Sequence, residues 1–372
     1  MLEKSWLGCA VVLALAAAHA MGSPAEEERA AEERVLNVYN WSDYIAEDTI
    51  ADFEERTGIK VNYDVFDSNE VLEAKLLAGN SGYDVVVPAA SFLERQIRAG
   101  IFARLDKDRL ANYGNLDAAI LERVAAHDPG NEHAVPYMWG TTGFGYNVAK
   151  VNAVLPDAPT DSWGMLFDPE VVAKLAPCGV TVLDAPTEVF ANLMGYLGRD
   201  PNSEDAADLE AFTEHMLLIR PHIRYFHSSQ NINDLANGEI CVAMGWSGDM
   251  LIARDRAAEA GQGVEVAYTI PREGAVIWFD TLAIPSDAPH PDNAHLFLDY
   301  MMEPEVAAAV SNYVFYANAN RASLPHVDEE VKTDPAIYPS VEVKDNLFAD
   351  LADSAEFTRL LTRAWTTVKT GR

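Results

Sequence analysis

Residues 35–44 read Val-Leu-Asn-Val-Tyr-Asn-Trp-Ser-Asp-Tyr, and this stretch begins the pattern that decides the fold. Residues 35–39 form a strand-like run, and a helical pattern follows around 46–57. The next expected elements are a strand at 59–65, a helix opened by a capping box at 67–70 with Asp67 as its cap, a buried strand at 83–88 and a helix at 91–99. Because strands and helices alternate, the sequence predicts an α/β layer with a largely parallel sheet.

The pattern changes after His133, and we expect the chain to enter a second lobe there. Residues 134–139 and 143–147 look like two strands joined by Gly140-Thr141-Thr142. Further expected elements are strands at 179–183, 239–245, 264–270 and 276–284, and helices at 187–198, 206–219, 291–302, 304–312 and 355–369. A chain of 372 residues is long for a single core, so two domains are expected.

The beginning of the chain has the features of a secretory signal. An apolar stretch runs from Trp6 to Ala18, and Ala18-His19-Ala20 offers a cleavage site, so residues 1–20 are predicted to be a signal peptide. Residues 21–34 form a polar leader that we expect to be disordered. No later stretch approaches the roughly 18 apolar residues of a membrane-spanning helix. The mature protein is therefore expected to be exported and soluble.

Charge and cysteine content narrow the classes of partner. The chain has 58 acids against 27 bases and a net charge of −31, which argues against nucleic acid as a partner. Only Cys178 and Cys241 remain after cleavage of the signal. In an exported protein these two cysteines can form one disulfide or stay as two buried thiols. Neither belongs to a C-x-x-C pair, so a redox or zinc site has little support.

Motifs of catalysis and cofactor binding are incomplete. Residues 245–249 miss the G-x-S-x-G nucleophile elbow because position 249 is aspartate, and neither a P-loop nor a full dinucleotide loop is present. His127 and His133 lie in a polar turn, where a solvated turn explains them better than a metal site does. These local motifs therefore give little support to an enzyme, a metal site or a cofactor site.

An aromatic residue is paired with an acid at or near three predicted strands. The pairs are Trp41 with Asp43, Trp246 with Asp249, and Trp278 with Asp280. Ligands of open α/β sheets bind beyond the carboxyl ends of the strands, where such residues would gather. Indole faces attract organic cations, and carboxylates add charge-assisted hydrogen bonds. The pattern predicts a site for a slender amine with several charges.

Two other interpretations use the same residue types. Tryptophans also bind sugars, so capture of a carbohydrate is a rival function. Two carboxylates could also serve a glycosidase, because their separation in space is not visible in the sequence. Each aromatic residue alone could equally be a part of the core.

Several long stretches carry a resemblance to a known family. They are residues 38–45, 63–70, 87–95, 136–139, 225–230 and 314–320, within a match from about Val35 to Lys369. The chain resembles periplasmic putrescine-binding proteins of polyamine ABC transporters. This resemblance implies a bilobal periplasmic-binding-protein fold of type II, with two α/β lobes joined by a hinge and a ligand cleft between them. It places residues 35–138 and 277–325 in the first lobe, and residues 139–276 and 326–372 in the second.

The resemblance also implies the ligand, the partner and the site. The protein would be a periplasmic monomer that binds putrescine or spermidine and hands it to a membrane permease, without catalysis. The ligand-binding residues carried over by match to the family's motif are Trp41, Ser42, Asp43, Tyr44, Glu188, Trp246, Asp249, Trp278, Asp280 and Tyr316. Cys178 and Cys241 stand where the family's disulfide partners fall.

Departures from the family pattern leave the choice of polyamine open. Ala89 replaces a serine of putrescine-type members, and Trp278 looks more like spermidine-preferring relatives. Ala185 lacks an acid that some spermidine binders place nearby, and Ser42 keeps the putrescine-type residue. We expect a polyamine, with putrescine favoured by the whole chain and spermidine by Trp278.

Overall fold

The structure is a computed structural model that describes residues 32–349 and 351–371. The predicted signal peptide and most of the predicted leader lie outside these residues, so both stay predictions. Within the described part of the chain, no helix is both long and apolar enough to cross a membrane.

Residues 35–98 fold as their alternating pattern predicts. Strand β1 (Val35–Trp41) lies between β2 (Lys60–Phe66) and β3 (Val85–Val86), and it pairs with both in parallel. The connecting helices are α1 (Thr49–Thr57), α2 (Asn69–Leu77) and α3 (Ala90–Arg98). Leu36, Phe53 and Leu72 are fully buried in the core between these elements. Burial of each of these side chains stabilises the packing of the helices on the sheet by about 1.5–3 kcal/mol.

The cap of α2 differs from the prediction by one residue. Ser68 has the extended backbone of a cap, and its hydroxyl accepts a hydrogen bond from the Val71 amide at 3.2 Å. The expectation that Asp67 caps this helix was wrong, because the serine next to it makes that bond. Asp67 is therefore free to face the cavity described below.

A single long strand replaces the two strands predicted after His133. Strand β4 (Ala134–Asn147) runs through Gly140-Thr141-Thr142 without a turn. Gly140 pairs with Trp278 of β9 (Val276–Ala283), and Thr142 pairs with Trp246 of β7 (Val242–Trp246). A side chain at position 140 would place its Cβ 2.7 Å from the Trp278 ring. Glycine thus marks a close approach inside a strand rather than a turn.

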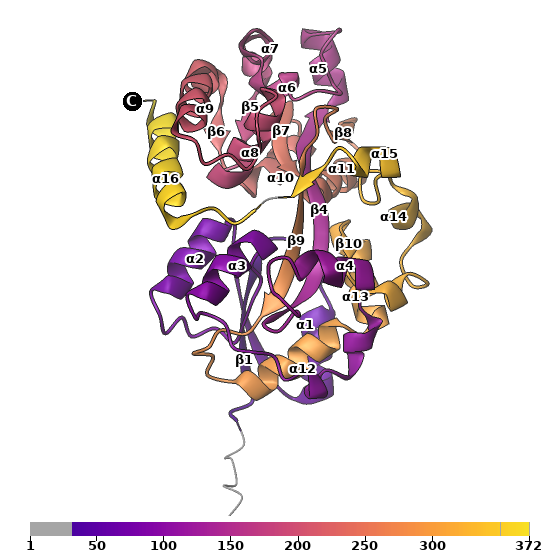
Figure 1. The fold of residues 1–372 in the computed structure, drawn as a ribbon. Coiled ribbons are helices and arrows are strands. Elements are labelled where there is room, and N and C mark those ends of the chain that lie inside the picture. Colours follow the sequence, from indigo (N-terminus) through magenta and orange to yellow (C-terminus); the bar gives the residue numbers. More distant parts are fainter. Residues whose placement is uncertain (1–31, 350, 372) are drawn as a thin grey trace, which may run out of the picture. The chain divides into compact units, whose positions relative to one another are not determined.

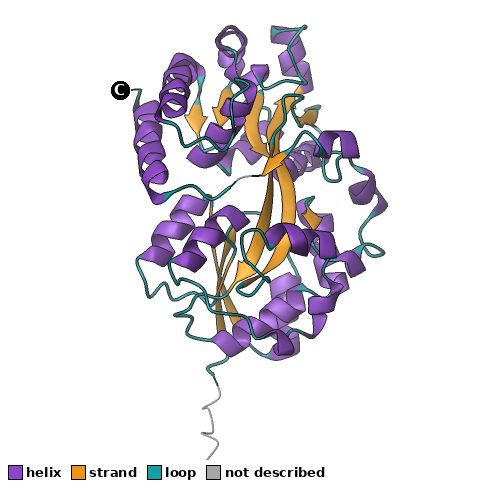
Figure 2. Cartoon of the chain, viewed as in Figure 1, coloured by secondary structure: helices purple, strands orange, loops and turns teal. Residues whose placement is uncertain are grey.

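Strand β4 belongs to both halves of the sheet, whose order is β2-β1-β3-β9-β4-β7-β5-β6. The second half contains β5 (Val180–Val182), β6 (Tyr225–Phe226), β7 and β8 (Val266–Thr269). Helices pack around each half, as Figures 1 and 2 show, and the long strands β4 and β9 run from one lobe into the other. The remaining α-helices and strands are α4 (Ala118–Val124), α5 (Val148–Val154), α6 (Gly164–Phe167), α7 (Pro169–Leu175), α8 (Pro186–Tyr196), α9 (Ala206–Ile219), α10 (Gln230–Ala236), α11 (Ser247–Ala260), α12 (Pro291–Met301), α13 (Pro304–Val314), β10 (Ala317–Asn318), α14 (Glu329–Thr333), α15 (Val341–Lys344), β11 (Phe348–Ala349) and α16 (Ala355–Thr370).

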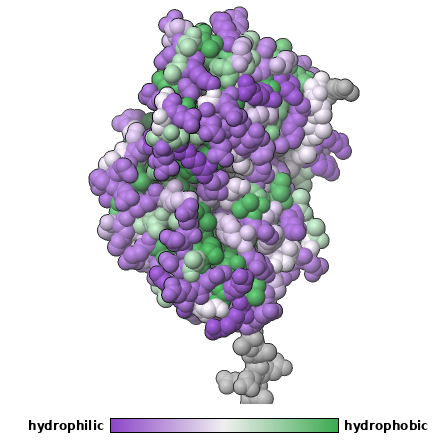
Figure 3. All heavy atoms as spheres, turned by 180° about the vertical axis from the view of Figure 1, so that it is seen from behind, coloured by the Kyte–Doolittle hydropathy of each residue, from purple (hydrophilic) through white to green (hydrophobic). Residues whose placement is uncertain are grey.

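Separate hydrophobic cores support the two lobes. One contains Leu36 and Phe297, and another contains Trp163, Phe212 and Trp365 of α16. A further cluster joins Trp139 of β4 and Phe279 of β9 to the segment around Val331 and Ile337. The lobe boundaries predicted from the sequence stay predictions. Figure 3 shows hydrophilic side chains over most of one face, in keeping with the high net charge of the chain.

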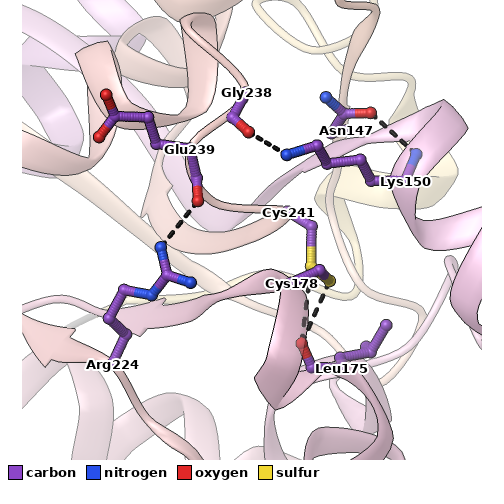
Figure 4. Close-up of a disulfide and its surroundings, with 8 residues drawn as sticks. All are labelled: Asn147, Lys150, Leu175, Cys178, Arg224, Gly238, Glu239 and Cys241. Carbon is purple, nitrogen blue, oxygen red and sulfur yellow. Dashed lines mark hydrogen bonds between the residues drawn. A yellow bond between two sulfur atoms is a disulfide. The ribbon is translucent and has the colours of Figure 1, made fainter.

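A disulfide joins Cys178 to Cys241, with 5.6 Å between their Cα atoms, as predicted. The two cysteines lie just before β5 and β7, and the turn before β7 is also held by Arg224 and Lys150, which donate to the carbonyl groups of Glu239 and Gly238 (Figure 4). The two cysteines are 63 residues apart in the sequence. Closing a loop of this length stabilises the folded protein by about 4 kcal/mol if the effect is the lost entropy of the unfolded chain. The disulfide lies at the amino-terminal ends of strands whose carboxyl-terminal ends face the site.

Candidate ligand-binding site

A cavity lies where the carboxyl ends of strands from both halves of the sheet meet. Nine of the ten predicted binding residues line it: Trp41, Ser42, Tyr44, Glu188, Trp246, Asp249, Trp278, Asp280 and Tyr316. They come from segments as distant as β1 and the residues after α13. The structure therefore brings together two complete pairs, Trp246 with Asp249 and Trp278 with Asp280, and the tryptophan of the third, Trp41.

Asp43 is the predicted residue that does not line this cavity. It has a positive φ of 53° and turns its carboxylate to Arg256 of α11, at 2.5 Å. Arg256 also donates to the side chain of Asn233 at 2.9 Å. Asp43 thus ties the end of β1 to α11, and its role in ligand binding stays a prediction.

Aromatic rings form the walls of the cavity. Trp41 meets Trp246 edge to face with 5.3 Å between ring centroids, and Trp278 meets Tyr316 in the same way at 5.3 Å. Tyr44 contacts Tyr316 at 5.2 Å, so rings from four separate segments touch. Edge-to-face pairs leave part of each ring face open to a ligand, and such faces attract cations.

Two aspartates lie deep between these rings. Asp280 accepts a hydrogen bond from the Tyr44 hydroxyl at 2.8 Å, and Asp249 accepts one from the Tyr316 hydroxyl at 2.8 Å. Their exposed fractions are 5% and 6%. A residue larger than glycine at 248 would lie 2.3 Å from the Tyr316 ring, so Gly248 lets this tyrosine reach Asp249.

Burial changes the acidity of both aspartates. Loss of solvent raises the pKa of Asp249 and of Asp280 to about 7, although the tyrosine hydroxyls work in the opposite direction. Repulsion from Asp249 is a smaller part of the raised pKa of Asp280. Among the described residues, no lysine or arginine forms an ion pair with either carboxylate. A cationic ligand would stabilise the charged form of both, so the site is suited to an organic cation.

Glu188 of α8 brings a third carboxylate to the cavity. Its side chain is half-buried. One of its oxygens accepts from the Thr142 hydroxyl at 2.5 Å and the other from the Trp246 indole at 3.4 Å. Asp184, earlier in the same segment, instead pairs with Lys369 at 2.7 Å and does not line the cavity.

The cavity includes residues that the sequence did not single out as ligand contacts. They are Phe66, Asp67, Asn69, Ser228, Ser229 and Ile232. Asp67 and Asn69 follow β2, so the rule that ligands bind beyond strand ends could have found them. The two serines follow β6, which has only two residues and left no recognisable strand pattern. In residues 32–349 and 351–371, no group of three or more histidine, cysteine, aspartate or glutamate side chains could hold a metal ion.

Comparisons with known proteins agree with this geometry. A family model described as bacterial extracellular solute-binding protein matches residues 48–339. The putrescine-binding periplasmic protein PotF of Escherichia coli strain K12 is 55% identical over 373 residues, covering 100% of this chain and 99% of the relative. The putrescine-binding periplasmic protein SpuD of Pseudomonas aeruginosa strain UCBPP-PA14 is 51% identical, covering 94% and 96%. A solved structure assigned to a spermidine/putrescine ABC transporter of Listeria monocytogenes is 29% identical, with a TM-score of 0.82 over 91% of this chain and 100% of that one.

Proposed function

Because this chain belongs to the bacterial extracellular solute-binding protein family, we propose that it captures a polyamine and delivers it to the permease of an ABC transporter. Family membership confirms the predicted bilobal α/β fold and the assignment to transport proteins rather than enzymes. The polyamine is putrescine or spermidine, in line with the named ligands of the relatives.

The observation that carries this function is the pair of buried aspartates between aromatic rings. A neutral sugar would leave both carboxylates desolvated and without an ion-pair partner among the described residues, which is costly in a buried site. An ammonium group beside them offers both the opposite charge and several N–H donors. Stacked indoles can hold the methylene chain between two such groups. The cavity thus favours a polyamine over the rival carbohydrate.

The cellular setting follows from the same family. Its members bind solutes outside the cytoplasm, and the relatives compared above are periplasmic. We propose that residues 1–20 direct export of this chain to the periplasm and that it acts there as a monomer. Size-exclusion chromatography with light scattering on the mature chain tests the oligomeric state.

Titration calorimetry on the mature chain, starting at residue 21, tests the function. Putrescine, spermidine and cadaverine are compared with a set of oligosaccharides. We expect saturable binding of one polyamine molecule per chain and no heat of binding with the sugars. The proposed function would be contradicted if a sugar bound, or if none of the polyamines bound.

A further inference from the structure

Strand β4 lies in the sheet between β9 and β7, the two strands that carry Trp278 and Trp246. Gly140 is paired with Trp278 on β9, and Thr142 is paired with Trp246 on β7. Residues two apart on a strand face the same side. One strand therefore sets the positions of both indoles, with Trp278 beside Gly140 and Trp246 beside Thr142.

Thr142 lies behind the cavity and contacts the ligand-facing Glu188. It is fully buried and is not among the residues that line the cavity. Its hydroxyl donates to Oε2 of Glu188 at 2.5 Å, while Nε1 of its cross-strand partner Trp246 lies 3.4 Å from Oε1. A cross-strand pair thus supplies one donor to each oxygen of a single carboxylate.

The backbone of Glu188 is held to the other shared strand. The side-chain amide of Asn192 donates to the carbonyl oxygen of Glu188 at 2.8 Å, and its oxygen accepts from the Val276 amide at 3.1 Å. Val276 begins β9, the strand that also carries Trp278 and Asp280. With its backbone fixed in this way, the remaining freedom of Glu188 lies in its side-chain torsions.

We propose that Thr142 is a positioning residue that holds the Glu188 carboxylate at a set distance from the buried aspartates. The inference rests on the proposed function and deepens it. A glutamate side chain loses considerable rotamer entropy when it is fixed, so a ligand that has to order it binds more weakly. Thr142 orders Glu188 before the ligand arrives. It thereby selects the spacing between the ammonium groups of the polyamine.

A double-mutant cycle tests this role. Putrescine and cadaverine affinities are measured by calorimetry for the wild type, Thr142→Val, Glu188→Gln and the double variant. We expect Thr142→Val to weaken putrescine binding about tenfold, the size expected for a lost hydrogen bond to a charged group. In the Glu188→Gln background the same change should cost less than about twofold, because Thr142 acts through that carboxylate.

Matched variants separate positioning from folding. Thr142→Ser keeps the hydroxyl and should restore putrescine affinity to within about twofold of the wild type. Thr141→Val removes a neighbouring buried hydroxyl that contacts Tyr268 at 3.0 Å, and it should leave the putrescine-to-cadaverine ratio unchanged. If Thr142→Val shows no cooperative thermal unfolding, Thr142→Cys, an unbranched residue with a weaker donor, takes its place.

The outcomes distinguish this inference from the proposed function. Unchanged affinity and unchanged length preference in Thr142→Val would overturn the inference while leaving polyamine binding intact. Losses that multiply fully in the double variant would also overturn it, because Thr142 would then act independently of Glu188. A wild-type chain that binds no polyamine would overturn the proposed function itself.

Discussion

Three of the carboxylates that line the cavity have contrasting surroundings. Asp249 and Asp280 are nearly fully buried, and each accepts a hydrogen bond from one tyrosine hydroxyl. Glu188 is half-buried, and each of its carboxylate oxygens accepts a hydrogen bond from the protein. We therefore expect the two aspartates to need a cationic ligand to stabilise their charged form, whereas two donors of the protein already contact the Glu188 carboxylate. This difference predicts unequal responses to mutation and to pH.

The largest effect should come from the buried aspartates. Asp280→Asn should weaken putrescine binding roughly 100-fold, because truncating one partner of a buried charge pair costs roughly 2–5 kcal/mol. Glu188→Gln should cost less, since this residue is half-buried and better solvated. Calorimetry measures both variants. Asp161→Asn, the same change at a site whose side chain is 69% exposed, serves as the control. A greater loss in Glu188→Gln than in Asp280→Asn would reverse the comparison.

Lowering the pH from 8 to 6 should weaken putrescine binding. The pKa of both aspartates is raised to about 7, and the ammonium groups of the ligand pair only with the ionised form. Below that pKa, binding should fall by about tenfold per pH unit for each aspartate that has to release a proton. The double variant Asp249→Asn/Asp280→Asn should show a much flatter profile in the same calorimetric series.

The stability of the ligand-free protein should change in the opposite direction. Between the unfolded pKa of aspartate, near 4, and about 7, the folded state binds more protons than the unfolded state. The contribution of these two residues to stability is therefore present below pH 4 and is lost as the pH rises to 7. Thermal unfolding of the wild type, compared with the double variant, measures this contribution. If the wild type gained stability relative to the variant as the pH rises from about 4 to about 7, the raised pKa of the two aspartates would be contradicted.

A smaller effect is expected at the Glu188 side. Trp246→Phe keeps an aromatic ring beside Trp41 but removes the indole donor, which lies 3.4 Å from Glu188. We expect about a threefold loss of putrescine affinity, because this contact is long and Thr142 still holds the carboxylate. Trp246→Ala should cost much more, since it also removes the ring. Equal losses in the two variants would show that the indole donor, not the ring, is what matters.

The smallest change in affinity is expected from Trp278→Phe. The buried Trp278 indole N–H has no acceptor among the described residues, so its removal breaks no hydrogen bond within the protein. We expect a shift of about twofold in the putrescine-to-spermidine affinity ratio toward putrescine, because the smaller ring holds less of a long chain. Parallel titrations with both polyamines measure the ratio. An unchanged ratio would remove Trp278 as a determinant of ligand choice.

Much of the site was accessible from the sequence because its residues follow recognisable elements. The parallel strands β1 and β3 alternate with helices, so Trp41 and Tyr44 could be placed at a strand end. The pairing of aromatic and acidic residues near other strands then indicated a cation site. Glu188 follows the predicted strand at 179–183, and Tyr316 follows the predicted helices near 291–312. Their role in ligand binding came from the resemblance to a family.

The sequence by itself determined the α/β class, the acidic and aromatic chemistry and the pair of cysteines, because these depend on composition and local periodicity. The tertiary structure alone decided that Gly140 lies within a strand, that Asp43 pairs with Arg256 and that Thr142 contacts Glu188. Each of these three features depends on pairing or contact between segments that are far apart in the chain. Their energies come from burial and close packing between strands and helices, which no local window of sequence contains.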